Sequence, residues 1–451
     1  MGELLSGNEL KWGLTMPSSP ACIKTRVLRR PHMHYAKTAS KVREQIIKFS
    51  GELSSGWPKV VRRFLAEVIY GIQARQSVRL TEIARSLEER IPIRKTQYRL
   101  CRQLGRRGLW IKLIRRLYGM GSWRIKQDTL LVLDISDIAK KYAQRMEYLT
   151  TVRDGSEGAL ANGYWTCSVI GTEVGESVFI PLYNRLYSQA GPDFISENAE
   201  VRKAISLVSE QTEKRGIWVL DRGGDRRKII HHLLRNKHRF ILRLKVDRHL
   251  VYRRKKQSVY EHALACPLLY SERIVKEDAG REKIYHLEFG YRPVKLPERK
   301  ESLYMVVVRG FGQEPMMLLT NIRVNKSRKA LWSIIESYMS RWRIEETIRF
   351  IKQSYNLEDI RLLTYLRLQN MMALVLAVAY FTMVYLGIKT KLRVLANHVL
   401  KAARRLFGVP DFRFYALADG IRQLLFGRQR GLEGFSQILK LENLQMSLFD
   451  P

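Results

Sequence analysis

Two short apolar runs that each end in an aspartate place the strongest constraint on the fold of this chain. Leu-Leu-Val-Leu leads into Asp134, and Ile-Trp-Val-Leu leads into Asp221. Such runs are typical of buried strands, and helical patterns separate several of them, so the sequence predicts a mixed α/β sheet covered by helices. Further strand-like runs lie at 164–171, 177–182 and 239–246.

The two aspartates fall where such sheets place their active sites. In open α/β sheets, ligands bind at the edge formed by the carboxyl ends of the strands. Two carboxylates at that edge could coordinate a divalent cation, and Mg²⁺ prefers carboxylate oxygen. Each acid could equally cap the turn that follows it. Nearby, Asp225 is interpreted as a helix N-cap, and Asp137 would face the opposite side of a continuing strand from Asp134.

A third polar group lies on a helical pattern over residues 337–353. Tyr338, Arg341, Glu345 and Lys352 follow one another at spacings of three, four and seven residues. At about 100° per residue they span only about 60° of the helix circumference. The pattern therefore predicts one stripe that carries an acid, two bases and a phenol. A solvated helix face with internal charge pairs would have the same spacing.

The net charge restricts the class of partner. The chain carries a formal charge of +37, which indicates a polyanion: nucleic acid or an anionic membrane surface. Residues 1–125 have more than twice the charge density of the rest and a helical pattern. A break near Pro92 separates two helices, the second of which bears Arg94, Lys95 and Arg99. These side chains could contact phosphates or enter a groove, or could form a solvated basic face.

One segment is apolar enough to suggest a membrane. Residues 371–388 contain no charge and approach the ~18–20 residues that a spanning helix needs. Basic sequence flanks the segment on both sides, so we expect a helix buried inside the protein and no membrane partner. The N-terminus has no apolar signal-peptide segment, and the four cysteines lie far apart, which favours a reducing cytoplasm.

These residues together resemble the DDE transposases of bacterial insertion sequences. The match is to the group marked by the signature Y-(2)-R-(3)-E-(6)-K, known as insertion-sequence family four. The segments around Asp134 and Asp221 resemble the first and second catalytic aspartates of that family, and the resemblance spans about residues 40–390. The signature falls on Tyr338, Arg341, Glu345 and Lys352.

The resemblance implies a ribonuclease H-like catalytic core with a β-rich insertion, plus an all-α N-terminal DNA-binding region. The strand pattern over residues 247–325, between the second Asp and the Glu, agrees with it. The expected organisation is a basic helical region (1–125), a first part of the core (126–246), the insertion (247–325), a second part of the core (326–390) and a helical tail (391–451).

The resemblance also implies an activity. Asp134, Asp221 and Glu345 would be the catalytic residues and would hold two Mg²⁺ or Mn²⁺ ions. The enzyme would bind the inverted repeats at the transposon ends, hydrolyse phosphodiesters there and join the 3′-OH ends to target DNA. The three other signature residues would contact the DNA backbone beside the cut. A homodimer in a synaptic complex on double-stranded DNA, in the cytoplasm and at the nucleoid, is expected.

Three other interpretations fit the same sequence. The chain could be a DNA-binding regulator that has lost catalysis on the same fold. It could be a ribonuclease H-like nuclease that cuts without joining strands. It could also be a basic membrane-surface protein anchored by residues 371–388. The complete set of three acids favours the transposase over the regulator.

Overall fold

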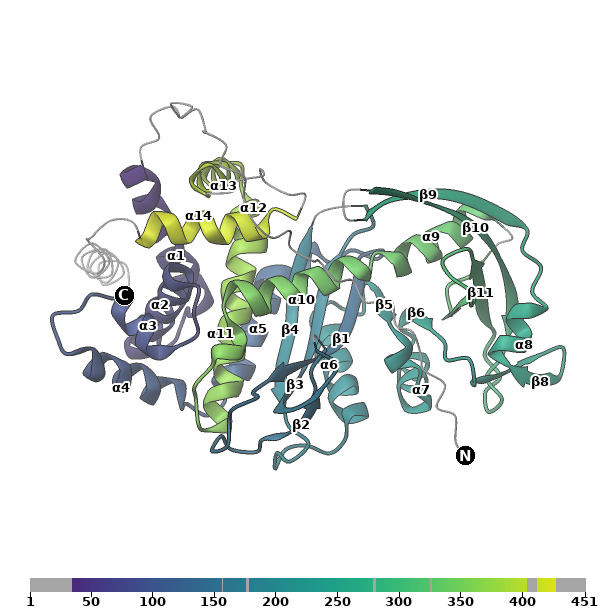
Figure 1. Cartoon of the computed structure of the whole chain (residues 1–451), viewed down its shortest axis with the longest axis horizontal. Coiled ribbons are helices and arrows are strands. Elements are labelled where there is room, and N and C mark those ends of the chain that lie inside the picture. Colours follow the sequence, from purple (N-terminus) through teal and green to yellow (C-terminus); the bar gives the residue numbers. More distant parts are fainter. Residues whose placement is uncertain are drawn as a thin grey trace, which may run out of the picture.

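The computed structural model describes residues 35–403 and 412–426, apart from 156, 176–177, 279–280 and 325–326. The first 34 residues, whose role the sequence left unassigned, and most of the predicted C-terminal tail lie outside the described residues. Figure 1 shows a helical region at one end of the molecule, a central sheet, and a second group of strands at the other end.

The helical region is built around α2 (Lys59–Arg75). This helix is buried from Phe64 to Ala74, because apolar and small residues occur on all its sides. It packs against the helices before and after it and against two helices from the C-terminal part of the chain. The neighbours along the sequence are α1 (Tyr35–Leu53), α3 (Leu80–Ser86), α4 (Ile93–Leu104) and α5 (Leu109–Gly121).

The central sheet begins at β1 (Leu130–Ala139), which lies between an antiparallel and a parallel neighbour. On one side the order is β1–β3–β4, with antiparallel pairing throughout, and on the other β1–β5–β6, with parallel pairing. A meander of three strands followed by two parallel strands confirms the predicted ribonuclease H-like α/β core. The other strands are β3 (Leu160–Thr172), β4 (Phe179–Tyr187), β5 (Ile217–Leu220) and β6 (Arg239–Arg243).

The connections of this core are the helical crossovers that parallel strands require. Helix α6 (Glu197–Gln211) leads into β5, and α7 (Arg227–Arg235) leads from β5 into β6. Ser196 caps α6, since its side chain accepts a hydrogen bond from the Ala199 backbone N–H at 3.2 Å. Strand β2 (Thr150–Arg153) pairs with the first residues of β3.

The strands predicted over residues 247–325 are present, and four of them extend the core sheet. Strand β12 (Met316–Thr320) pairs antiparallel with β6, so the two groups of strands form one continuous sheet. A separate hairpin is followed by α8 (Val259–Leu264). The remaining strands are β7 (His249–Tyr252), β8 (Lys255–Ser258), β9 (Tyr270–Asp278), β10 (Arg281–Val294) and β11 (Leu303–Arg309).

The single helix predicted over residues 337–353 is two helices, α9 (Arg328–Met339) and α10 (Trp342–Ser354). The break falls at Ser340, whose hydroxyl donates to the Glu336 carbonyl oxygen at 2.9 Å. A serine that bonds back in this way commonly bends a helix. Figure 1 shows the pair running one after the other from the insertion towards the helical region.

The apolar segment is a core helix, as predicted. Helix α11 (Tyr365–Tyr380) continues through a π-helical turn (Phe381–Tyr385) into the short α12 (Leu386–Ile388). Of its most apolar 18-residue window 89% is buried, against β4, α5 and α2. This burial favours a core helix over a membrane span. Helices α13 (Thr390–Ala402) and α14 (Phe414–Phe426) then pack back onto the helical region.

Candidate active site

The pairing of two parallel strands brings Asp134 and Asp221 to the same level of the sheet. Strands β1 and β5 pair Leu130 with Ile217 and, two residues on, Val132 with Val219. When this register is continued by two residues, Asp134 lies opposite Asp221. Adjacent strands lie ~4.8 Å apart, so the two aspartates are neighbours. Asp221 directly follows β5, as predicted, but β1 continues from Asp134 to Ala139, so the prediction that Asp134 ends its strand is wrong. Both side chains belong to half-buried residues.

Asp221 also caps the turn that follows it. Its Oδ1 accepts a hydrogen bond from the Gly223 backbone N–H at 2.8 Å, at the start of the 3₁₀ turn Arg222–Gly224. A side chain at Gly223 would place its Cβ 3.0 Å from that oxygen. Asp221 therefore caps the following turn and also lies at the edge of the sheet.

Glu345 lies in the first turn of α10, and Arg341 lies just before that helix. The Arg341 Nη2 is 2.8 Å from the Glu345 Oε1. The two groups differ in burial: Arg341 is 9% exposed, whereas the Glu345 side chain is 51% exposed. The guanidinium is thus buried in the site, while the carboxylate reaches it from the surface.

Electrostatic coupling joins these side chains into one cluster. Burial, and then the charge of Asp221, raise the pKa of Asp134 to about 7, and Glu345 acts in the same direction. Arg341 and Lys352 oppose this rise. Burial by itself would lower the pKa of Arg341, but the nearby Tyr338 and the three carboxylates raise it above its usual value. Segments far apart in the sequence therefore meet at one site.

The donor chemistry of the site suits a hard divalent cation. Carboxylate oxygens are the ligands that Mg²⁺ prefers, and a cation would remove the repulsion that raises the pKa of Asp134. Within the described ranges, no group of three or more His, Cys, Asp or Glu side chains is close enough to hold a metal ion. Glu345 is turned towards Arg341 instead. The three acids fit a metal in donor type, but the arrangement in this structure, with Glu345 paired to Arg341, does not bring them close enough to share one.

Lys352 has a partner that the sequence did not indicate. Its Nζ is 3.5 Å from the Oδ1 of Asp137, a buried acid that also accepts from the Gly155 backbone N–H at 3.4 Å. Strand β1 continues through Asp137, as the opposite-face interpretation requires. Asp137 therefore positions Lys352 beside the site; the only signal in the sequence was its closeness to Asp134.

Tyr338 is fully buried at the end of α9, with the Arg341 guanidinium carbon 5.8 Å from the centre of its ring. In the part of the chain that the structure describes, the Tyr338 hydroxyl and the Arg341 Nε have no hydrogen-bond partner. Buried polar atoms are seldom left unpaired. Both donors are buried, so a phosphate oxygen could accept from them only after the side chains that cover them move.

The interpretation of Asp225 as an N-cap is wrong. Helix α7 begins at Arg227, and Arg226 precedes it without a side-chain cap. The buried Asp225 carboxylate instead accepts from the Lys245 backbone N–H at 2.8 Å and pairs with Arg248. Asp225 thus ties the turn that starts at Asp221 to the chain that leaves β6.

The three basic residues of α4 lie in different surroundings. Arg94 and Lys95 are exposed, and the Arg94 Nη2 is 3.2 Å from the Tyr98 hydroxyl. Arg99 turns inward and pairs with two acids of the bundle, Glu67 at 2.5 Å and Glu89 at 2.7 Å. The structure therefore offers Arg94 and Lys95 to a partner, and uses Arg99 to hold α4 against α2.

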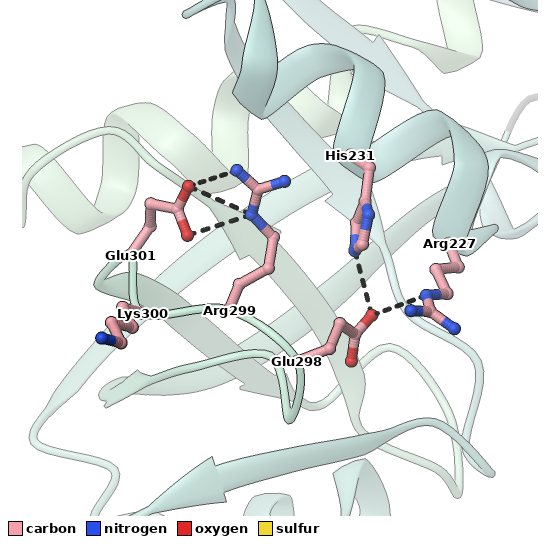
Figure 2. A pocket seen from close by; sticks show the side chains of 6 residues that line it. All are labelled: Arg227, His231, Glu298, Arg299, Lys300 and Glu301. Atoms are coloured by element: carbon pink, nitrogen blue, oxygen red, sulfur yellow. Dashed lines mark hydrogen bonds and ion pairs between the residues drawn. The ribbon is translucent and has the colours of Figure 1, made fainter.

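A surface pocket of about 580 Å³ lies outside this site, between α7 and the loop that joins β10 to β11 (Figure 2). Several of its charges are paired within it: Glu298 is 3.0 Å from His231 and 3.3 Å from Arg227. Arg299 donates to Glu301. None of the residues predicted for the site lines this pocket, so it is no part of the acidic cluster.

Comparisons with known proteins bear on the class of enzyme. The family described as "Transposase DDE domain" matches residues 196–381, which include Asp221 and Glu345, and this supports a DDE transposase. No protein of curated function matches the sequence. One similar solved structure is described as "Cryo-EM structure of piggyBac transposase synaptic complex with hairpin DNA (SNHP)". It is 11% identical, with a TM-score of 0.40, over 90% of this chain and 84% of that chain.

Proposed function

We propose that this protein is a DNA transposase of the YREK group of insertion sequences. It binds the terminal inverted repeats of its element, cleaves the DNA at the ends by metal-dependent phosphodiester hydrolysis and joins the 3′-OH ends to target DNA. The observation that carries this proposal is the β1–β5 register, which brings Asp134 level with Asp221. Glu345, on α10, joins the same electrostatic cluster. The family match supports the class of enzyme.

Asp134, Asp221 and Glu345 are the residues that would hold two Mg²⁺ or Mn²⁺ ions. When bound, the ions supply a nucleophile at neutral pH and stabilise the charge of the leaving oxygen. Glu345 has to leave Arg341 to join the other two acids.

The bases of the stripe bind the DNA backbone next to the cut. Arg341 stays charged, as arginines do in proteins. Burial lowers its pKa, but Tyr338 and the carboxylates raise it by more. A guanidinium can donate two parallel hydrogen bonds to one phosphate. Once Glu345 is released, Arg341 and the Tyr338 hydroxyl both have donors for phosphate oxygens, and Lys352 adds a point charge from the next turns of α10.

The helical region supplies the grip on the transposon ends. Arg94 and Lys95 lie on the exposed side of α4, at the start of that helix. Both can reach phosphates when α4 approaches a groove. Two ends must be brought together before they are joined, so the active form is a homodimer on double-stranded DNA. The same DNA places the protein in the cytoplasm, at the nucleoid.

The test compares two adjacent acids on α10. Glu345→Gln removes an acid of the cluster, whereas Glu346→Gln removes one that pairs with Arg349 of the same helix. With DNA that carries the element ends and Mg²⁺, Glu345→Gln, Asp134→Asn and Asp221→Asn should bind without cutting, and Glu346→Gln should cut normally. Full cutting by any of the first three removes that residue from the site.

The wild-type protein separates the alternatives in the same assay. Binding of the ends without metal-dependent cutting would indicate a regulator that has lost catalysis. Cutting without transfer of the 3′-OH ends to a second duplex would indicate a nuclease. Cutting followed by joining is the result that this proposal requires.

A further inference from the structure

The hairpin of β7 and β8 carries four consecutive cations at its tip. Arg253 and Arg254 form the turn, and Lys255 and Lys256 begin β8; all four are exposed. The guanidinium carbon of Arg253 lies 5.2 Å from the centre of the Tyr252 ring, and that of Arg292 lies 4.8 Å from it. The tip therefore presents a compact positive charge, part of which rests on an aromatic ring.

The backbone of the turn is costly for arginine. Tyr252 pairs with Lys255, so the loop has two residues, and both have positive φ: +48° at Arg253 and +68° at Arg254. Two-residue turns of this kind strongly prefer Asn-Gly, because a side chain in the left-handed region costs roughly 1–2 kcal/mol. The chain keeps two arginines where Asn-Gly would give a more stable turn. Their side chains therefore have a use outside the fold.

The base of the hairpin is held firmly. Val251 and Lys295 exchange two backbone hydrogen bonds, at 2.8 and 2.9 Å, which join β7 to the end of β10. His262 of α8 is fully buried, and its Nε2 is 3.1 Å from the Leu250 carbonyl oxygen. Ser258 and Glu261 close a capping box at the start of α8. The tip is thus a rigid projection.

The hairpin is also fixed relative to the acidic cluster. Arg248, next to the first residue of β7, pairs with the buried Asp225, which also accepts from the Lys245 backbone N–H. Asp225 ends the 3₁₀ turn that Asp221 caps. A short chain of strong contacts therefore connects the hairpin to the catalytic edge of β5.

We propose that the tip of the β7–β8 hairpin grips the phosphate backbone of duplex DNA at a fixed distance from Asp221. This inference rests on the proposed function, since that function supplies DNA as the polyanion. Four flexible cations on a rigid, narrow support can follow phosphates without reading bases. Such a contact sets the position of the duplex on the enzyme, and its strength depends on salt.

The test uses a double variant that improves the turn while removing charge. Arg253→Asn with Arg254→Gly leaves the preferred residues for this turn, so the Tm should stay the same or rise. Binding of the full-length protein to a plain DNA duplex is then measured over a series of KCl concentrations. The slope of log K against log salt should become shallower by about 1.8, and binding should weaken about tenfold near physiological salt.

A matched control exists at the opposite edge of the sheet. Lys214 and Lys237 are exposed and also have positive φ, +59° and +58°, and they precede the starts of β5 and β6. Lys214→Asn with Lys237→Gly therefore removes the same charge and relieves the same backbone strain. This variant should bind the duplex with the wild-type slope.

Each outcome decides a separate point. If the wild type binds the duplex and the hairpin variant keeps the wild-type slope, the inference is overturned and the proposed function stands. If both double variants lose slope equally, the effect is one of overall charge, and the hairpin grip is again overturned. If the wild type does not bind duplex DNA at all, the proposed function fails and the hairpin grip fails with it.

Discussion

Asp134 lies half-buried on β1, level with Asp221 and inside the field of Glu345. Burial and the charge of Asp221 raise its pKa from the ordinary value of 3.8 to about 7. Between these two pH values the folded protein binds more protons than the unfolded chain does. The free energy of unfolding therefore falls as the pH rises through this window. The burial of Asp134 next to a like charge therefore lowers the free energy of unfolding, a cost that is common at functional sites.

Asp134→Asn should remove this pH dependence. In EDTA at pH 8 the variant should be more stable than the wild type by about 1–3 kcal/mol, a figure reduced for the partial exposure of the site. At pH 4 the two proteins should be equally stable. Urea unfolding at both pH values measures the difference. A variant that is less stable than the wild type at pH 8 would show that Asp134 makes favourable interactions there.

Tyr338→Phe separates a structural from a DNA-binding role. The Tyr338 hydroxyl is buried and makes no hydrogen bond to any residue that the structure describes. Its loss should therefore change the free energy of unfolding by less than about 1 kcal/mol. Cleavage of end DNA should nevertheless fall, because a donor to phosphate is lost. A variant that cuts at the wild-type rate would remove the Tyr338 hydroxyl from the DNA contacts.

Among single residues, the sequence singled out candidate side chains for the site but missed the residues that position them. The spacing of the signature and the aspartates after apolar runs pointed to Asp134, Asp221 and Glu345, whose charges influence one another in the structure. Their catalytic role stays a prediction. The ion pairs of Asp137 and Asp225 were missed because their partners lie elsewhere in the chain. Asp137 pairs with Lys352, which is distant in sequence, and Asp225 pairs with Arg248, which follows the next strand. Ion pairs of this kind leave no periodic pattern.

Among the elements, α11 determines how the helical region is joined to the sheet. Asn370 on this helix is fully buried and bonds to three backbone groups of the α4–α5 connection. It accepts from the Trp110 N–H at 2.9 Å and donates to the carbonyl oxygens of Leu104 and Arg106 at 2.7 and 2.9 Å. The apolar helix α11 therefore holds the helical region against the sheet both by apolar packing and by the buried hydrogen bonds of Asn370.

Asn370→Leu should lower the free energy of unfolding by about 2–4 kcal/mol, because three buried backbone groups would lose their partner. The neighbouring Gln369, whose side chain makes longer hydrogen bonds at 3.3–3.4 Å, serves as control. Gln369→Leu should cost less than about 1 kcal/mol. Equal effects of the two substitutions in urea unfolding would contradict the role given to Asn370.

The position of Asp221 after its strand and the buried apolar helix were predictable, because each depends on a local pattern, whereas the continuation of β1 beyond Asp134 was not. The break between α9 and α10 was not predictable, because it depends on the hydroxyl of one serine and leaves the helical pattern of the sequence unchanged. The pairing of β12 with β6 was equally hidden, since partners about 80 residues apart are chosen by the whole sheet. The division of the chain into the five expected regions stays a prediction.

The whole molecule carries its positive charge in distinct places. The α4 surface bears Arg94 and Lys95, the hairpin tip bears four cations, and Arg341 lies at the acidic cluster. A charge of +37 first indicated only some polyanion. Part of this positive charge belongs to internal ion pairs such as that of Arg99 with Glu67. The sequence alone could not distinguish such paired bases from free ones.

Two variants of α4 should therefore behave differently. Arg94→Gln with Lys95→Gln should leave stability unchanged and make the salt slope of end binding shallower by about 1.8. Arg99→Gln should instead lower the free energy of unfolding by about 1–3 kcal/mol, because Glu67 is buried and keeps only Arg63 as a partner. Thermal unfolding and anisotropy titrations measure both effects. A large loss of stability in the first variant would contradict this division.

The central claim is that Asp134, Asp221 and Glu345 form one divalent-cation site. Fe²⁺ can replace Mg²⁺ in carboxylate sites, and with ascorbate and peroxide it cuts the polypeptide next to where it is bound. Cuts are expected near residues 134, 221 and 345, and excess Mg²⁺ should suppress them. They should be lost in Glu345→Gln and kept in Glu346→Gln. Cuts confined to one of these segments, or cuts that Mg²⁺ does not suppress, would contradict it.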